Sequence, residues 1–137
     1  MAEIRKAELI PILIDTSVWI SFFRGDPQVV DQIKSFIQTD RIRTASLIIA
    51  ELLQGARDDT ELWDIAESME AFPRLPEPPG IWDEAGKLSY RLRRKGNALG
   101  LADCYLAALA KLNGVGIYTL DLGFKKIAEQ EMGIESV

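Results

Sequence analysis

Histidine is absent from the 137-residue sequence. Its absence excludes Ser-His-Asp and Cys-His nucleophilic catalysis, zinc sites that depend on imidazole ligands, and histidine as a general base. If the chain is an enzyme, its chemistry must come from carboxylates, lysine, tyrosine, hydroxyl groups or a bound metal ion.

Cysteine and long apolar runs are also scarce. The single cysteine, Cys104, excludes an internal disulfide framework and is typical of a protein from a reducing compartment. No apolar run approaches the ~18 residues that a membrane-spanning helix needs, so no membrane partner is expected. Together these features predict a cytoplasmic protein.

Basic residues are in the minority. The chain has 16 lysines and arginines against 21 aspartates and glutamates, a formal net charge of −5. This balance argues against simple electrostatic capture of nucleic acid, because phosphate groups are negative as well. A locally basic patch could still bind nucleic acid, and the excess acid could surround a cation. Composition leaves both interpretations open.

Short apolar runs alternate with amphipathic segments along the chain. The pattern predicts strands over residues 9–14, 41–44 and 115–120, and shorter extended segments over 72–76 and 134–137. It predicts helices over residues 18–23, 27–38, 47–56, 60–71, 81–95, 99–112 and 122–131. Strands that alternate with helices indicate a parallel sheet covered on both faces. We therefore expect an α/β fold in a single domain over residues 1–137.

Several residues predict where these elements begin and how they pack. Pro11 cannot donate to a sheet ladder, so pairing of the first strand is expected to begin at or just after it. Asp26 and Pro27 predict the N-cap and the first turn of a helix. Ser46 is a predicted N-cap for the next helix, and Ile37 is expected on a helix face that packs against the sheet.

Two acids follow predicted strands directly. Asp15 ends the first apolar run and Asp121 ends the run over residues 115–120. Ligands of open α/β sheets bind at the carboxyl ends of the strands, which is where both acids would lie. An equally good explanation is that each carboxylate caps the helix that follows it.

Two further acids lie on helix faces that are otherwise apolar. Three of the four residues one turn away from Glu51 are apolar or glycine, and all four around Asp103 are apolar or glycine. A buried, unpaired carboxylate is costly, so each would need a cation, hydrogen-bond donors or a proton. The alternative is a partly exposed acid at the edge of a helix, where the helix dipole would also favour Asp103.

If these four acids converge, their mutual repulsion destabilises the site unless a cation compensates for it. Carboxylate oxygens without histidine or thiolate suit Mg²⁺ or Mn²⁺. Such an ion could generate hydroxide and shield a phosphodiester during in-line attack, with a second ion ~3.5–4 Å away in the two-metal form. Thr16, Ser17 and Thr119 could orient the carboxylates or hold metal-bound waters, although capping and strand propensity explain each of them too.

At these residues the sequence resembles the PIN-domain ribonucleases, specifically the VapC-type toxins of type II toxin–antitoxin systems. Four blocks carry the resemblance and occur in the family's order: IDTSVWI at 14–20, AELLQG at 50–55, GLADCYLAA at 100–108 and YTLDLGF at 118–124. Each block alone is weakly specific, whereas four in order across nearly the whole chain are fairly specific.

The resemblance implies a parallel-sheet, PIN-like α/β/α sandwich with Mg²⁺- or Mn²⁺-dependent endoribonuclease activity. By the same resemblance, Asp15, Glu51 and Asp103 match the central metal-binding and catalytic acids, and Asp121 matches a more variable fourth. The family often carries another acid two residues later, where this chain has Gly123. That departure favours one tightly bound ion over two.

The resemblance also implies partners. Relatives form homodimers and are silenced by a small antitoxin protein that wraps the toxin and blocks the acidic cleft. Trp19, Phe22, Phe23 and Trp63 are candidates for an apolar contact surface, although aromatic residues at such spacings are more often part of a core.

An RNA substrate requires contacts to its phosphates. The densest basic run covers residues 91–95 and includes Arg93 and Arg94, while Lys125 follows Asp121 closely. These three residues, with the hydroxyls of Thr16 and Thr119, are the candidate substrate contacts. A solvated charged surface is the competing explanation for each basic residue.

Two other classes of protein gather acids at strand ends. A receiver-type signalling domain with an acidic cation site would need an adjacent acidic pair after the first strand and a phospho-accepting aspartate after the third. Asp15-Thr16 and the proline-rich segment 72–76 supply neither. A phosphatase with an aspartate nucleophile would need a second acid at Ser17. The endoribonuclease is therefore preferred.

Overall fold

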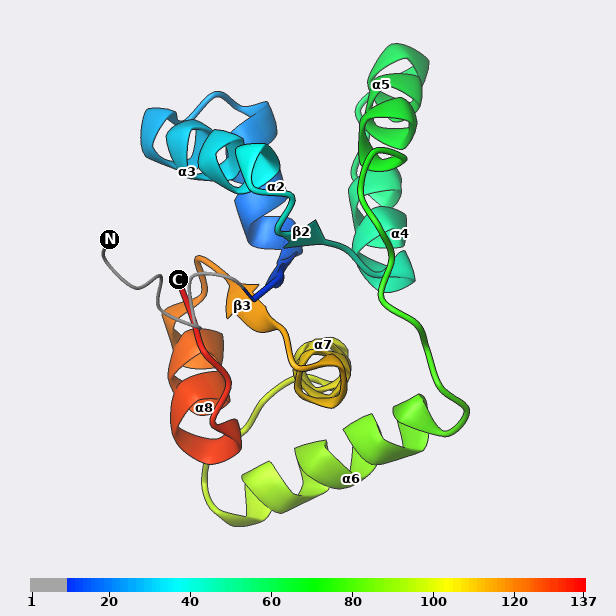
Figure 1. Ribbon diagram of the computed structural model, residues 1–137. Coiled ribbons are helices and arrows are strands. Elements are labelled where there is room, and N and C mark those ends of the chain that lie inside the picture. The colour runs from blue at the N-terminus through cyan, green and yellow to red at the C-terminus, as the bar shows by residue number, and fades with distance from the viewer. Residues whose placement is uncertain (1–9) are drawn as a thin grey trace, which may run out of the picture.

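The fold is built on a small parallel sheet (Figure 1). The computed structural model describes residues 10–137. Within them the strands are β1 (Ile12–Ile14), β2 (Ile42–Arg43) and β3 (Gly116–Tyr118), in the order β2-β1-β3 and all parallel. The predicted parallel sheet and α/β fold class are confirmed.

The central strand β1 begins to pair just after Pro11, where the missing proline N–H predicts it. The Ile12 N–H donates to the Arg41 carbonyl over 2.7 Å, and Ile12 lies opposite both Ile42 and Gly116. Pairing just after Pro11 is therefore confirmed. The predicted first residue of this strand, at position 9, lies outside the described residues. The prediction of a single domain over 1–137 stays a prediction for the same reason.

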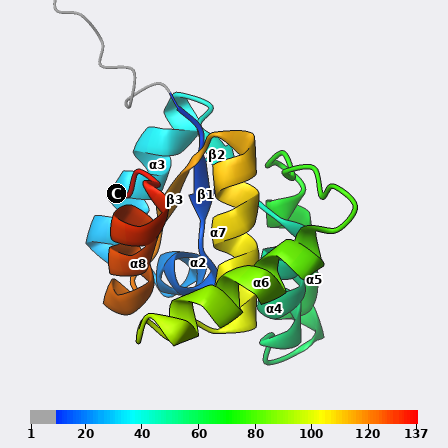
Figure 2. The same ribbon diagram turned by 90° about the horizontal axis from the view of Figure 1, so that it is seen from below.

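Helices cover both sides of the strands (Figure 2). Figure 2 shows α8 and α3 on one side of β1 and α7 on the other. The bounds of the helices are α2 (Thr16–Phe23), α3 (Pro27–Gln38), α4 (Ser46–Gln54), α5 (Asp59–Met69), α6 (Ile81–Arg94), α7 (Leu101–Asn113) and α8 (Leu122–Met132). No helix within residues 10–137 is long and apolar enough to cross a membrane.

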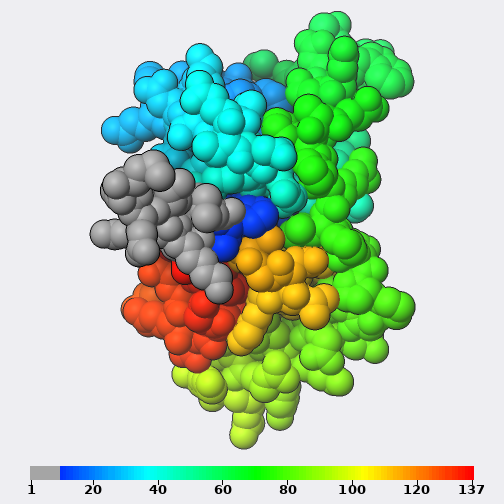
Figure 3. Space-filling view, viewed as in Figure 1, coloured from blue at the N-terminus to red at the C-terminus, as the bar shows by residue number. Residues whose placement is uncertain are grey.

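The core surrounds β1. Its residues Ile12, Leu13 and Ile14 are 3%, 1% and 0% exposed, and little of this blue segment is visible among its neighbours in the space-filling view (Figure 3). Burial on both faces is why the strand is a continuous apolar run rather than an alternating one. The consequence is that the polar residues directly after β1 are held at one edge of a rigid sheet.

Three predictions about local packing are wrong. Ser46 is the first residue of α4 rather than its cap; Ala45 is the N-cap and provides no side-chain hydrogen bond. Ile37 is 47% exposed, because Val29, Ile33 and Phe36 already fill the inner face of α3. Trp19, a candidate for a contact surface, is 1% exposed and belongs to the core.

The extended segments at 72–76 and 134–137 pair with the sheet over a single residue each. Each contributes one isolated parallel bridge, Thr44 with Arg74 and Ile117 with Ser136. Proline cannot donate in a ladder, which limits pairing in the first of these segments. The sheet therefore stays narrow, and its carboxyl edge is formed by the residues that follow β1 and β3.

A candidate metal centre at the carboxyl edge of the sheet

Asp15 lies directly after β1 and its carboxylate is held by three donors. The Thr16 N–H donates to Oδ1 over 2.8 Å, while the hydroxyls of Thr119 and Ser17 donate to Oδ2 over 2.8 and 3.0 Å. The residue is 9% exposed and is the N-cap of α2. The capping explanation is therefore confirmed. A cap needs only one donor, however, and this carboxylate accepts from three, two of them after β1 and one after β3.

The turns after β1 and β3 are joined to each other. The Asp15 N–H donates to the Tyr118 carbonyl over 2.9 Å. In return, the Leu120 N–H donates to Ser17 Oγ over 3.1 Å. Because strand ends in a parallel sheet meet at one edge, these bonds bring residues about a hundred positions apart into one polar cluster.

Glu51 reaches the same cluster from α4. The Thr16 hydroxyl donates to Glu51 Oε1 over 3.4 Å, a long hydrogen bond. Burial raises the pKa of Glu51, the negative charge of Asp15 raises it further, and the bond from Thr16 opposes both. The half-buried glutamate is therefore close enough to Asp15 to be destabilised by it.

Asp103 reaches the cluster from the first turn of α7. Burial and, in decreasing order, the charges of Asp15, Asp121 and Glu51 together raise the pKa of its carboxyl to about 6. A carboxylate that is destabilised by three other acids must lie within electrostatic reach of all of them. The four acids predicted to converge are thus gathered in one region of the structure.

Asp121 is the most exposed of the four acids and has a second role. Its Oδ1 accepts from the Phe124 N–H over 3.1 Å, so it is the N-cap of α8. The capping explanation is confirmed here as well. A Cβ at Gly123 would lie 3.3 Å from the same oxygen, so the cap leaves little room for a larger side chain at that position.

The donor set has the chemistry of a site for a hard cation. It contains carboxylate and hydroxyl oxygens and no thiolate, the combination that suits Mg²⁺ or Mn²⁺. Within residues 10–137, however, no three acidic or cysteine side chains are close enough together to ligate one ion. The residues therefore fit a divalent cation by type and by region, and an ion would have to draw the carboxylates inward.

The predicted substrate contacts fall into two groups. The hydroxyls of Thr16 and Thr119 donate to acids of the cluster, so they orient carboxylates. The guanidinium of Arg93 lies 5.9 Å from the ring centre of Tyr90, while Arg94 is exposed. Lys125 is half-buried in the first turn of α8, one turn beyond Asp121.

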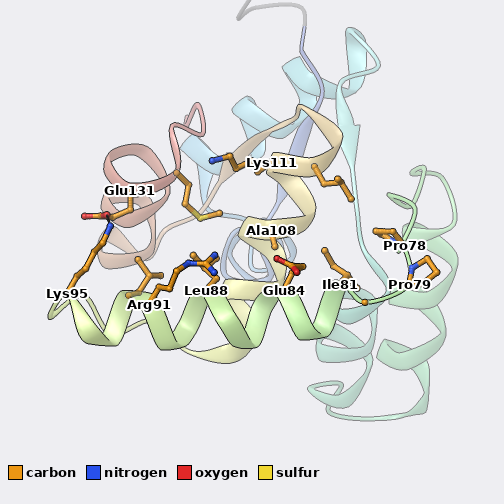
Figure 4. Close-up of a pocket in the computed structure, with 14 residues that line it drawn as sticks. Pro78, Pro79, Ile81, Glu84, Leu88, Arg91, Lys95, Ala108, Lys111 and Glu131 are labelled. Carbon is orange, nitrogen blue, oxygen red and sulfur yellow. Dashed lines mark hydrogen bonds and ion pairs between the residues drawn. The ribbon is translucent and has the colours of Figure 1, made fainter.

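The basic end of α6 borders a different hollow (Figure 4). This cavity of about 600 Å³ lies between α6, α7 and α8, and Lys95 pairs across it with Glu131 over 3.3 Å. Arg91 also lines it, whereas none of the described residues that line it is one of the four acids. The hollow is therefore separate from the acidic cluster.

The sequence alone did not reveal a second cavity, which shares Glu51 with the cluster. Its volume is about 640 Å³, and Phe23, Arg24 and Gly55 line it together with Glu51. The signals in the sequence are Phe23, a candidate for an apolar contact surface, and Gly55, which lies one turn after Glu51. Sequence reasoning also missed that the buried Tyr105 hydroxyl donates to Glu77 while its ring stacks on Trp82.

Comparison with known proteins gives concordant results. The family model described as "PIN domain" matches residues 12–130. Ribonuclease VapC11 from Mycobacterium tuberculosis is 32% identical over 122 residues, which cover 85% of this chain and 91% of that protein.

Two solved structures share the fold. VapBC-1 from nontypeable Haemophilus influenzae has a TM-score of 0.74 at 18% identity, with 93% of this chain and 97% of that chain covered. VapBC-5 from M. tuberculosis, described as a member of the VapBC family of toxin–antitoxin systems, has a TM-score of 0.66 at 22% identity and coverages of 91% and 95%.

Proposed function

The chain belongs to the PIN domain family, with VapC ribonucleases as its relatives, and on this premise we propose that it is a metal-dependent endoribonuclease. It hydrolyses phosphodiester bonds in RNA as the toxin component of a toxin–antitoxin module. The observation that carries the proposal is the polar cluster at the carboxyl edge of the sheet, where Thr119 and Ser17 donate to Asp15 and Thr16 donates to Glu51.

The four acids take the metal-binding and catalytic roles. Asp15, Glu51 and Asp103 hold the ion, and Asp121 is the more variable fourth ligand. Their mutual repulsion supports this assignment, because a divalent cation would offset it while a site without one retains the full cost. A bound Mg²⁺ or Mn²⁺ would activate a water molecule for attack and neutralise charge on the phosphate.

The chain itself supplies orientation. The hydroxyls of Thr119 and Ser17 fix one oxygen of Asp15, and Thr16 holds Glu51. A carboxylate held in this way loses little conformational freedom when it ligates an ion. One tightly bound ion is favoured over two, because Gly123 stands where relatives often have another acid.

Contacts to the RNA are assigned to Arg93, Arg94 and Lys125, which place positive charge on a chain that is acidic overall. They would hold phosphate groups and so make binding dependent on salt. Thr16 and Thr119 act on the same substrate through the carboxylates that they orient.

The partners follow from the relatives. VapBC-5 is described as a toxin–antitoxin system, which supports a small cognate antitoxin for this chain. A homodimer and a cytoplasmic location stay predictions. The receiver-type domain with an acidic cation site is not favoured, because the relatives with the higher identity are ribonucleases.

The test is cleavage of total RNA in Mg²⁺ by the wild type and by Asp15→Asn. The single oxygen of asparagine can accept from the Thr16 N–H and keep the N-cap. Its amide nitrogen then donates to the hydroxyls of Thr119 and Ser17, which can accept as well as donate, so the fold should be kept while cleavage is lost. Asp31→Asn, an exposed acid on α3, is the matched control and should retain activity. Full activity of Asp15→Asn at an unchanged melting temperature would refute the proposed function.

A further inference from the structure

The cavity beside Glu51 has the composition of a binding site for one nucleotide. It lies between α2, α4 and α5, and its volume of about 640 Å³ is within the range of small-ligand pockets. Leu52 and Ile65 form apolar parts of its lining, and Glu51 is shared with the acidic cluster. Whatever occupies the cavity is therefore next to the proposed site of cleavage.

Phe23 offers a flat apolar ring at this cavity. It is 41% exposed, yet its ring is held in place by two others. Trp19 stacks on it at 6.1 Å with 29° between the ring planes, and Phe22 meets it edge-on at 5.5 Å. An exposed aromatic ring with a rigid backing is the feature on which proteins stack the bases of single-stranded nucleic acid.

Arg24 adds positive charge beside that ring. Its side chain is exposed and has no hydrogen bond or ion pair within residues 10–137, and it lines the same cavity. Arg57, also in the lining, is already paired with Glu61 over 2.8 Å. Arg24 is thus the cation that is available to a phosphate group.

A third acid in the lining, Asp64, favours a base over a simple anion as the ligand. Asp64 is exposed and accepts no hydrogen bond within the described part of the chain. A carboxylate here would repel a free phosphate, but it can accept from the amino or imino group of a base. The combination of Phe23, Arg24 and Asp64 matches a base with its phosphate better than an anion alone.

From this arrangement we propose that the cavity binds one unpaired nucleotide of the RNA next to the cleaved bond. The base stacks on Phe23, and Arg24 contacts the phosphate. This inference rests on the proposed endoribonuclease activity and adds to it a subsite for one base beside the cleaved bond. The hollow in Figure 4 does not compete for this role, since it contains neither an exposed aromatic ring nor any of the four acids in its lining.

The experiment couples a change in the protein to a change in the RNA. A short single-stranded RNA that contains one mapped cleavage position is prepared with an abasic nucleotide at each of the flanking positions in turn. Cleavage efficiency, kcat/KM, is measured in Mg²⁺ for the wild type, Phe23→Leu and Phe23→Tyr. Leucine keeps apolar contact with Trp19 and Phe22 without a flat ring, and melting curves verify that each variant is folded.

One abasic position should lower kcat/KM of the wild type about 5- to 100-fold, as expected for one stacked base. Phe23→Leu should lose a similar factor on intact RNA and lose nothing further at that position. Phe23→Tyr should behave like the wild type. Trp82→Leu is the matched control, because Trp82 is 44% exposed and its ring is backed by Tyr105, but it does not line the cavity.

An abasic effect of the same size in Phe23→Leu would overturn the inference, as would equal losses in Phe23→Leu and Phe23→Tyr. If Phe23→Leu cleaves RNA normally but no longer binds the cognate antitoxin, the cavity belongs to the protein partner instead. If the wild type cleaves no RNA, the proposed function fails and this inference fails with it. If the wild type cleaves RNA but the abasic effect does not depend on Phe23, the nucleotide site alone is refuted and the proposed function stands.

Discussion

Replacing Asp103 by asparagine should stabilise the metal-free protein at neutral pH. The carboxyl has its pKa raised to about 6 by burial and by the charges of Asp15, Asp121 and Glu51. Asparagine removes the charge and keeps the size of the side chain. A residue that has only a structural role would show the opposite effect.

The size of the expected gain in the free energy of unfolding follows from the linkage between proton binding and folding. A rise in pKa from 3.8 to about 6, at ~1.36 kcal/mol per pH unit, sets an upper bound of ~3 kcal/mol. The edge of the sheet is open to solvent, which screens the charges, so we expect about 1–2 kcal/mol. For a chain of this length that raises the melting temperature by about 3–7 °C.

The sign of the pH dependence is fixed by the direction of the pKa change. Because the folded protein holds this proton more tightly than the unfolded chain does, Asp103 costs stability as pH rises from about 4 through about 6. Below about pH 4 the acid is protonated in both states and the cost vanishes. The advantage of Asp103→Asn should therefore be small near pH 4 and complete above pH 7.

The assay is thermal or urea unfolding in EDTA between pH 4 and pH 8. Asp83→Asn, an exposed acid in the first turn of α6, is the matched control and should show no such pH-dependent gain. A loss of stability in Asp103→Asn that is the same at every pH would refute the reasoning and assign Asp103 a structural role.

Further predictions concern orientation, metal and substrate. Thr119→Val removes the 2.8 Å bond to Asp15 and should lower kcat at least tenfold, whereas Thr119→Ser should retain most activity; equal loss in both would point to packing instead. Added Mg²⁺ should raise the melting temperature of the wild type but not of Asp15→Asn, as calorimetry would show. Arg93→Ala combined with Arg94→Ala should weaken RNA binding and reduce the slope of log Kd against log salt by about two, unlike Lys34→Ala on α3. An unchanged slope would locate the phosphate contacts elsewhere.

Much of the fold could be predicted from the sequence because its signals are local. Asp26 and Pro27 determine where α3 begins, since capping and a fixed φ act over one turn of chain. Pro11 determines where β1 can start to pair, because it has no N–H to donate. The same short-range logic placed Asp15 directly after β1, whereas Asp121 lies three residues beyond the end of β3, which is shorter than predicted.

Local signals fail where tertiary packing determines which side chains are buried. Ile37 has the right spacing for a buried face, yet it is exposed because its neighbours already cover the sheet. The face of a helix can be inferred from periodicity, but what lies against that face cannot. Ser46 failed as a cap for a related reason, because the chain enters α4 one residue earlier than its composition indicates.

Some features of the candidate site could likewise be predicted from the sequence, and others could not. Residue types, their positions at strand ends and the absence of histidine were sufficient to predict a hard-cation site of four acids. Only the tertiary structure decided that Asp103 lies within electrostatic reach of the other three, and that the Thr119 hydroxyl holds Asp15 across 104 positions of sequence. It alone revealed the cavity beside Glu51. Those facts depend on how distant segments pack, and Coulombic and hydrogen-bond energies depend on distances in space, which spacing along the chain does not determine.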